Sequence, residues 1–308
     1  SDVYKRQVTE APPRASLPSP LTPKEAADLA ASHGLRTLSE RPQLGRYLAD
    51  LWQRRSFLWT LSSAQTRAQN EGNHLGQLWA LLNPAFLIGS YFLIFGLLLD
   101  TRGGVANFVA FLAIGVIMFA FTSSVITRGA KAISSNTSLV RALHFPRAIL
   151  PMSVMLTELL AAVPAFALLF GLMLITGETP DWEWLLFPVA VIMQGLALLG
   201  IAFICARIVN ASRDMGNLIP VMVRLLRYVS GVFFPVAHYA KGLPHLAQDM
   251  LVYQPFSLML TTGRQALLTD PDHDVVLTDW LVMAAWAIGL VTIGLVVFWR
   301  DEARYGRG

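Results

Sequence analysis

Long apolar stretches of about 20 residues recur along this chain, and they limit its fold more than any other feature. A stretch of that length spans a bilayer as an α-helix. The composition agrees, because 54% of the 308 residues are hydrophobic and only 14% are charged. An ordinary soluble domain carries about 25% charged residues. We therefore expect an all-α polytopic membrane protein.

Six of these stretches are long enough to cross a membrane. We place the spans at Trp79–Leu99, Val105–Thr127, Ala148–Ile175, Leu185–Ala206, Gly216–Pro235 and Trp280–Trp299. As a helix the first would be about 31 Å long, which matches a hydrocarbon core of about 30 Å. Pro84, Pro164 and Pro220 are expected to kink their helices, which membrane spans tolerate when neighbours satisfy the freed carbonyls.

Lysine and arginine residues are distributed unevenly between the loops, and this bias sets the orientation of a membrane protein. Nineteen of the twenty-four lie in residues 1–78, 128–147, 207–214 and 300–308, and only three lie in the loops on the other side. We therefore expect both termini in the cytoplasm, with 128–147 as a basic cytoplasmic loop.

The chain before the first span divides into two parts. Residues 1–46 are rich in proline and predict a mobile cytoplasmic tail, with one short helix that begins at the capping box Thr22–Glu25. Residues 47–78 predict an amphipathic helix and a connector. Leu51, Trp52 and Trp59 share its apolar face, which favours a helix lying in the membrane interface over one packed on a soluble core.

Residues 236–279, between the fifth and sixth spans, are too long for a tight turn. They contain two short apolar helical patterns, Leu243–Tyr253 and Phe256–Leu268, separated by Pro255. Runs of this length are typical of re-entrant or interfacial segments. We expect a re-entrant helical hairpin in the outer leaflet.

Sequence signals for catalysis are missing. No stretch matches the phosphate-binding loop G-x-x-x-x-G-K-[ST], and the six histidines are too scattered for a metal site. The single cysteine, Cys205, cannot form an intrachain disulfide. We expect no catalytic residue, metal or cofactor in this chain, so the energy for any transport has to come from another chain.

Charged residues inside the expected spans need partners, because a central arginine costs roughly 2.5–3.5 kcal/mol on the insertion scale. Arg224 and Arg227 are three residues apart and share a helix face. Glu158 lies in the third span at a depth comparable to that of Arg224. One hypothesis is a structural ion pair between Glu158 and Arg224. The other is that Arg227, with or without Arg224, faces a polar cavity and meets an anionic substrate.

Several motifs resemble those of ABC transporter type-two permeases that export polysaccharides. GQLWALLNP (Gly76–Pro84) opens the first span, and LVRALHFPRAILP (Leu139–Pro151) ends the basic loop. Three shorter motifs follow in the family's order: Ser212–Asp214, Phe233–Pro235 and Gln254–Phe256. The resemblance covers roughly Leu48 to the C-terminus.

The resemblance implies a homodimer of six-span subunits in the bacterial inner membrane. It also implies two copies of a separate ATPase subunit, which holds ATP and Mg on the cytoplasmic face. The implied cargo is a polyprenyl-diphosphate-linked glycan, such as an O-antigen, a teichoic acid or a cell-wall galactan precursor, and no nucleic acid is expected as a partner. In such an exporter the amphipathic helix is a gate, and the basic loop carries a coupling helix.

Particular side chains are then expected in these roles. The coupling residues are Ser134, Asn136, Leu139, Arg141, His144 and Arg147, and the gate residues are Leu51, Trp52 and Trp59. The expected substrate path contains Arg224, Arg227, Phe233, Phe234 and Tyr253. The aromatic members would stack on sugars, or they would serve as ordinary membrane-interface aromatics.

Two other functions stay open from the sequence. One is a related permease that exports a drug or a small lipid. The other is an integral-membrane glycosyltransferase, which would need acidic or metal-binding residues on the cytoplasmic side. The loop acids are expected on the opposite side: Asp181, Glu183, Asp270, Asp272 and Asp274.

Overall fold

The computed structural model describes residues 22–32, 43–70, 78–99, 104–142, 145–269 and 274–302. The chain divides into two compact units, Ser1–Arg41 and Pro42–Gly308. In the first unit, helix α1 (Pro23–Ser32) begins at the predicted capping box. The Thr22 hydroxyl and backbone N–H both donate to Glu25 Oε2, at 2.7 and 2.9 Å, and these bonds lower the pKa of the Glu25 carboxyl. Most of the predicted tail lies outside the described residues.

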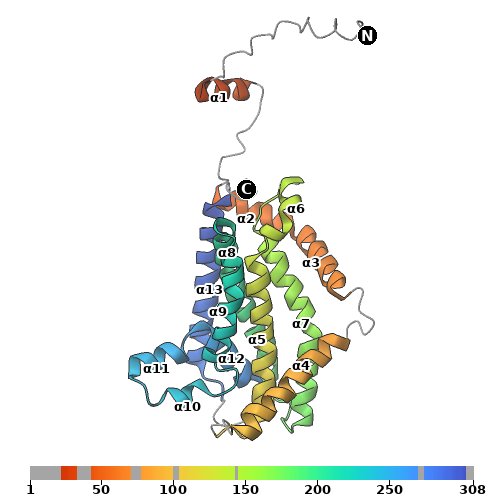
Figure 1. Ribbon diagram of the computed structural model, residues 1–308, viewed down its shortest axis with the longest axis vertical. Helices are drawn as coiled ribbons and strands as arrows, with labels where there is room; N and C mark the ends of the chain where they lie inside the picture. The colour runs from red at the N-terminus through yellow and green to blue at the C-terminus, as the bar shows by residue number, and fades with distance from the viewer. Residues whose placement is uncertain are drawn as a thin grey trace, which may run out of the picture. The chain divides into compact units, whose positions relative to one another are not determined.

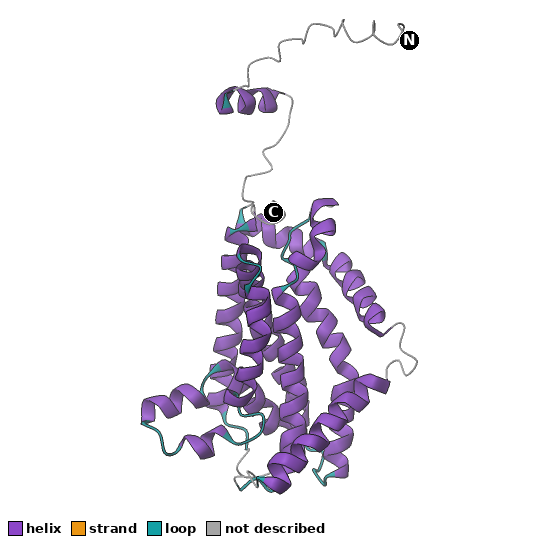
Figure 2. Ribbon diagram, viewed as in Figure 1, coloured by secondary structure: helices purple, strands orange, loops and turns teal. Residues whose placement is uncertain are grey.

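The described part of the second unit consists of helices and the loops that connect them (Figures 1 and 2). Five helical stretches are long and apolar enough to cross a membrane: Leu81–Leu98, Phe108–Ala130, Ile149–Ile175, Trp182–Ala211 and Leu277–Arg300. They correspond to α4 (Leu78–Tyr91) continued by the π-helix η1 (Phe92–Leu98), α5 (Phe108–Ala130), α7 (Ile149–Ile175), the short η3 (Trp182–Leu185) with α8 (Leu186–Ala211), and α13 (Leu277–Arg300). The chain is a multi-pass membrane protein.

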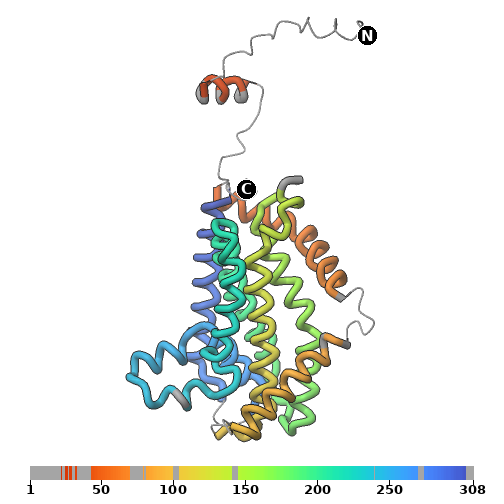
Figure 3. Tube along the Cα trace, in the orientation of Figure 1, coloured from red at the N-terminus to blue at the C-terminus, as the bar shows by residue number. Residues whose placement is uncertain are grey.

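Helix α5 forms the centre of this unit. In its span 78% of the residues are buried, against 22% in α7 and in α13, because α5 packs against α4, α7, α8, α9 and α12 (Figure 3). Its side chains are apolar on all sides, which is typical of a helix enclosed by other helices. The buried core of the unit is therefore built around α5.

The fifth predicted span is shorter than expected. Helix α9 (Met215–Val229) has 15 residues, about 22 Å of helix, which falls short of a hydrocarbon core of about 30 Å. After it the chain turns at Gly231, where φ is +78° and an added Cβ would lie 2.3 Å from Val236 Cγ2. Only glycine fits that position. Within the described ranges, five stretches rather than six have the length and composition of a span.

Three shorter helices follow α9. They are α10 (Val236–Ala240), α11 (His245–Val252) and α12 (Pro255–Leu267), at the end of the unit opposite α2 and α6 (Figure 1). Helices α11 and α12 flank Pro255 as the sequence predicted. Pro255 is the first residue of α12, where its missing N–H costs no hydrogen bond.

The predicted amphipathic helix is two helices, α2 (Leu44–Gln53) and α3 (Arg55–Asn70), separated at Arg54. Tyr47 of α2 is buried, and Leu51 packs in the same cluster. Trp52 and Trp59 are 72% and 55% exposed, so much of the apolar face points away from the protein. Between α5 and α7 the chain forms η2 (Ser134–Asn136) and α6 (Thr137–Ala142).

Candidate functional site

A seam of polar side chains joins α3 to α7. Thr157 Oγ1 donates to Gln65 Oε1 at 3.1 Å and lies 3.4 Å from the Ser62 carbonyl. Ser62 Oγ donates to the Ser153 carbonyl at 3.3 Å, and Thr66 Oγ1 to the Thr157 carbonyl at 3.4 Å. Hydrogen bonds between small polar residues are a usual means of joining helices in membranes. The seam holds α3 along the cytoplasmic half expected for α7.

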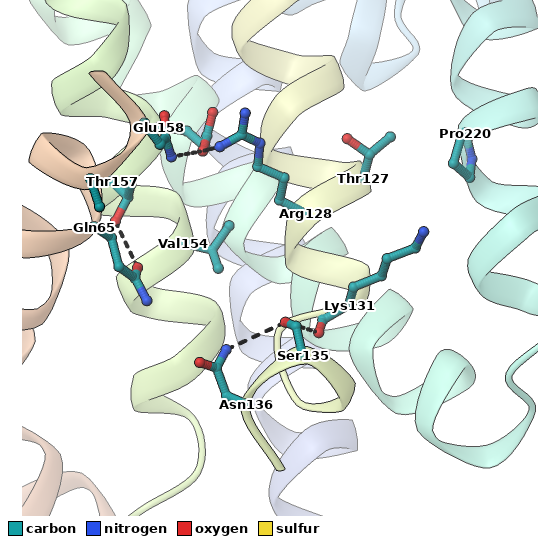
Figure 4. A pocket seen from close by; sticks show the side chains of 12 residues that line it. Gln65, Thr127, Arg128, Lys131, Ser135, Asn136, Val154, Thr157, Glu158 and Pro220 are labelled. Carbon is teal, nitrogen blue, oxygen red and sulfur yellow. Dashed lines mark hydrogen bonds and ion pairs between the residues drawn. The ribbon is translucent and has the colours of Figure 1, made fainter. Parts of the chain in front are cut away.

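Glu158 lies where this seam meets α5. Its carboxylate, only 6% exposed, accepts a hydrogen bond from Gln69 Nε2 at 3.1 Å, and its Oε1 is 3.0 Å from Arg128 Nη1 (Figure 4). Arg128 is 53% exposed, so the net contribution of this ion pair to stability is small, about 0–1 kcal/mol. Its importance is positional, because three helices, α3, α5 and α7, meet at one carboxylate.

The ion pair differs from the one that the sequence suggested. Glu158 pairs with Arg128 and not with Arg224, whose side chain is exposed on α9. Depth along the helices did match Glu158 to Arg224, but α5 lies next to α7, and α9 packs on α5 and α8. The third and fifth predicted spans are therefore not locked to each other by this pair.

A cavity of about 700 Å³ opens beside Glu158. Its lining comes from four helices and the loop after α5: Gln65, Ala68, Gln69, Thr127, Arg128, Lys131, Ser135, Asn136, Val154, Thr157, Glu158 and Pro220. Figure 4 shows Lys131 extending from the end of α5 toward Pro220 of α9. Two cationic side chains and one carboxylate line the cavity, so its net charge is positive. It can attract an anionic group.

Arg227 is held by aromatic residues. Its Nη1 donates to the Tyr91 hydroxyl at 3.0 Å, and its guanidinium lies 5.4 Å from the centre of the Phe119 ring. These contacts tie α9 to α4 and α5, and they favour a structural role for Arg227. Arg224, one turn earlier, stays exposed.

The aromatic residues of the expected substrate path fall in different surroundings. Phe233 is 1% exposed, stacked on Phe95 at 4.5 Å and edge-on to Tyr91 at 4.7 Å. It is a core residue in this structure, with no face free for a sugar. Phe234 is half-buried and Tyr253 is 38% exposed. Tyr253 lines an apolar cavity with Trp286 of α13, whereas the described contacts of Arg227 are with Tyr91 and Phe119.

The expected coupling residues are only partly described. Ser134 is exposed, and its hydroxyl donates to the Lys131 carbonyl at 3.2 Å. Asn136 Nδ2 donates to the Ala132 carbonyl at 2.8 Å, which closes the turn after α5. Leu139 packs on a small apolar cluster. His144 and the side chain of Arg141 lie outside the described residues.

Arg147 belongs to a half-buried polar node at the end of α13. Its backbone N–H donates to Glu302 Oε1 at 2.8 Å, and its guanidinium contacts the Glu302 carbonyl. The Tyr47 hydroxyl donates to Glu302 Oε2 at 2.9 Å and accepts from the Ala148 N–H at 3.2 Å. Burial raises the pKa of the Glu302 carboxyl, against the lowering effect of these bonds. The node links α2, the loop before α7 and the end of α13.

Sequence reasoning missed the residues that build the seam and the node. Ser62, Gln65, Thr66 and Gln69 have the spacing i, i+3, i+4, i+7 of one helical face. That polar stripe is a signal that the sequence itself carries. Nothing local in the sequence marks Tyr47 and Glu302 as partners, because 255 residues separate them.

Comparison with known proteins identifies similar sequences. The model of the ABC-2 type transporter family matches residues 57–268. An O-antigen export system permease protein, RfbA of Myxococcus xanthus, is 31% identical over 251 residues, which cover 79% of this chain and 93% of the relative. RfbA of Klebsiella pneumoniae is 22% identical over 262 residues, 84% of this chain and 95% of the relative. The polysialic acid transport protein KpsM of Escherichia coli is 25% identical over 237 residues, 74% and 87% of the two chains.

The family match extends from α3 to the end of α12 and so contains the polar seam, the cavity and the helices around α5. The first of these relatives aligns over nearly its whole length. By these similarities the chain belongs to the ABC-2 type transporter family.

Proposed function

We propose that the chain is the permease of an exporter that moves a lipid-linked polysaccharide, such as an O-antigen or a cell-wall galactan precursor, out of the cytoplasm. As a member of its family it is a transport subunit and not an enzyme, and ATP hydrolysis resides in a separate ATPase partner. The names of its relatives, two O-antigen export permeases and a polysialic acid transport protein, support a polysaccharide as cargo.

The observation that carries this proposal is the cationic cavity beside the α3–α7 seam. A diphosphate needs positive charge, and Arg128 and Lys131 supply it near the cytoplasmic end expected for α5. The exposed Trp52 and Trp59 suit a helix at the membrane interface, beside which a lipid tail can stay in the bilayer. In this proposal α3 is the gate, and its movement widens the cavity.

The assembly in this proposal is a homodimer in the inner membrane, with both termini in the cytoplasm and two ATPase subunits below. Only 11% of the residues in the span Leu81–Leu98, formed by α4 and η1, are buried within one chain. This span is therefore free to contact lipid or a second copy of the protein. Helix α9 together with α10–α12 would complete a sixth crossing. The ATPase, carrying ATP and Mg, would dock on η2 and α6, and its motion would reach α2 and α13 through the Arg147–Glu302–Tyr47 node.

A depletion experiment tests the cargo. Removing the protein from cells should cause lipid-linked glycan to accumulate on the cytoplasmic face, where mass spectrometry of extracted lipids identifies it. If cells stop exporting polysaccharide but accumulate no glycolipid, the polysaccharide proposal is wrong. Accumulation of a small lipid or a drug would support the related alternative.

A variant experiment tests the cavity. Lys131→Gln removes one cationic group from it without touching a described side-chain bond and should lower transport by the reconstituted complex several-fold, whereas Lys131→Arg should retain transport. The matched control is Arg67→Gln, which removes a charge from an exposed position of α3 outside the cavity lining. Equal transport by Lys131→Gln and the control would show that the cavity does not receive the cargo.

A further inference from the structure

Helix α12, the last of the three short helices α10–α12, carries a buried arginine. Arg264 is 4% exposed, and its Nη2 donates to the carbonyls of Gly231 and Val232, at 2.9 and 3.2 Å. The guanidinium carbon lies 3.4 Å from the centre of the Phe111 ring. Its Nε has no hydrogen-bond partner. Among the described residues, no carboxylate lies within ion-pair distance of it.

This charge persists at neutral pH. A guanidinium is effectively always protonated in a protein, even when it is buried. A buried charge without a counter-charge is costly. The fold nevertheless makes room for it, since a Cβ on Gly115 of α5 would lie 2.8 Å from Arg264 Nη2. The two backbone carbonyls and the Phe111 ring satisfy some of the hydrogen-bonding groups of the guanidinium, but they carry no negative charge to balance it.

A cavity of about 330 Å³ lies against this arginine. Besides Arg264, its polar lining includes Lys241 and His238 near α10, Gln265 of α12 and Asp279 of α13. Asp279 Oδ2 accepts a hydrogen bond from Gln265 Nε2 at 2.7 Å, and Gln265 Oε1 accepts from Trp280 Nε1 at 2.8 Å. Two permanent cations therefore face one carboxylate that is already engaged, and the cavity is net positive.

We propose that this cavity binds a phosphate group, carried by an anionic lipid or free in solution. A guanidinium and an ammonium together are a usual phosphate-binding pair, and a volume of about 330 Å³ exceeds that of the group. Leu246 and Met250 of neighbouring α11 are 75% and 69% exposed, which fits contact with lipid chains beside the phosphate. The site is separate from the cavity of the proposed transport function and does not depend on it.

The test uses the full chain in a neutral detergent at neutral pH. Inorganic phosphate replaces chloride at constant ionic strength in one arm, and phosphatidylglycerol or phosphatidylcholine is added in the other, while the melting temperature is followed. A ligand that binds the folded state raises that temperature in proportion to its occupancy. Phosphate or phosphatidylglycerol should raise it by several degrees, and phosphatidylcholine should not.

Two variants and a control decide the location of the effect. Arg264→Gln should abolish the shift, and Lys241→Gln, at an exposed position that leaves the core intact, should weaken binding up to about fivefold. Arg300→Gln removes an exposed charge at the far end of α13 and should leave the shift unchanged. A response only to phosphatidylglycerol assigns the site to a lipid headgroup, and a response to inorganic phosphate assigns it to the free ion. No response to either, or a response that survives Lys241→Gln undiminished, overturns the proposal.

Discussion

A close contact between two helices gives a sharp prediction about the stability of the protein. Helices α8 and α13 touch at Gly200 and Gly294, and a Cβ on Gly294 would lie 2.3 Å from the Gly200 carbonyl oxygen. Ordinary contact begins at 3.4 Å, so Gly294→Ala requires the two backbones to separate by about 1.1 Å. Neither backbone can rotate out of the way as a side chain can. Such overpacking typically costs about 1–3 kcal/mol.

The same helix supplies the control. Gly289 of α13 has nothing within 4 Å of an added Cβ, so Gly289→Ala meets no atom and gains up to about 1 kcal/mol from the better helix propensity of alanine. The two variants make the same chemical change five positions apart. We expect their free energies of unfolding to differ by about 1–4 kcal/mol, with Gly294→Ala the less stable.

Thermal unfolding in detergent, followed by loss of the monodisperse peak in size-exclusion chromatography, measures this difference. A gap of about 1–4 kcal/mol corresponds to a melting temperature lower by about 2–8 °C for Gly294→Ala, at about 2 °C per kcal/mol for a chain of this size. Equal melting temperatures for the two variants would refute the reasoning, because they would show that α8 and α13 do not cross at these glycines.

Three further predictions concern single charged residues. Burial raises the pKa of the Glu302 carboxyl, so the folded state binds its proton more tightly than the unfolded state does. The resulting stabilisation is fully present below the ordinary pKa of the carboxyl and is lost as the pH rises through the raised value. On acidification the melting temperature of the wild type should therefore rise more than that of Glu302→Gln, measured in thermal melts at several pH values. Glu178 accepts from Asn107 Nδ2 at 2.8 Å and from Thr269. Glu178→Gln should cost about 1–3 kcal/mol in a thermal melt, because its amide would face another donor. Arg141→Glu should uncouple the partner's ATPase activity from transport while the spans stay inserted.

Each of these has an outcome that contradicts it. Parallel pH profiles of the wild type and Glu302→Gln would show that the carboxyl is not perturbed by burial. For Glu178 the control is Glu183→Gln, at an acid of the neighbouring η3, and equal losses in both variants would contradict the hydrogen-bond argument. Transport that stays coupled in Arg141→Glu, measured as cargo moved per ATP hydrolysed, would remove that residue from the docking surface.

The sequence alone determined the class of the protein and most of its helices. Stretches of about 20 apolar residues have no stable alternative to a buried helix, because an unpaired backbone in lipid is too costly. The predicted spans near α4, α5, α7, α8 and α13 are therefore found at nearly the expected places. The capping box at Thr22 and the short helices around Pro255 are equally local signals, and both are confirmed.

Only the tertiary structure decided which of these helices are neighbours and hence which charges meet. Glu158 could be matched by depth to Arg224, but adjacency in the bundle gives it Arg128 and Gln69 instead. Phe233 looked available to a sugar, yet three aromatic rings enclose it. The length of an apolar stretch determines that it forms a helix in a membrane, but it does not determine which other helices that helix packs against. Those are set by packing of side chains and glycine contacts between segments far apart in the chain.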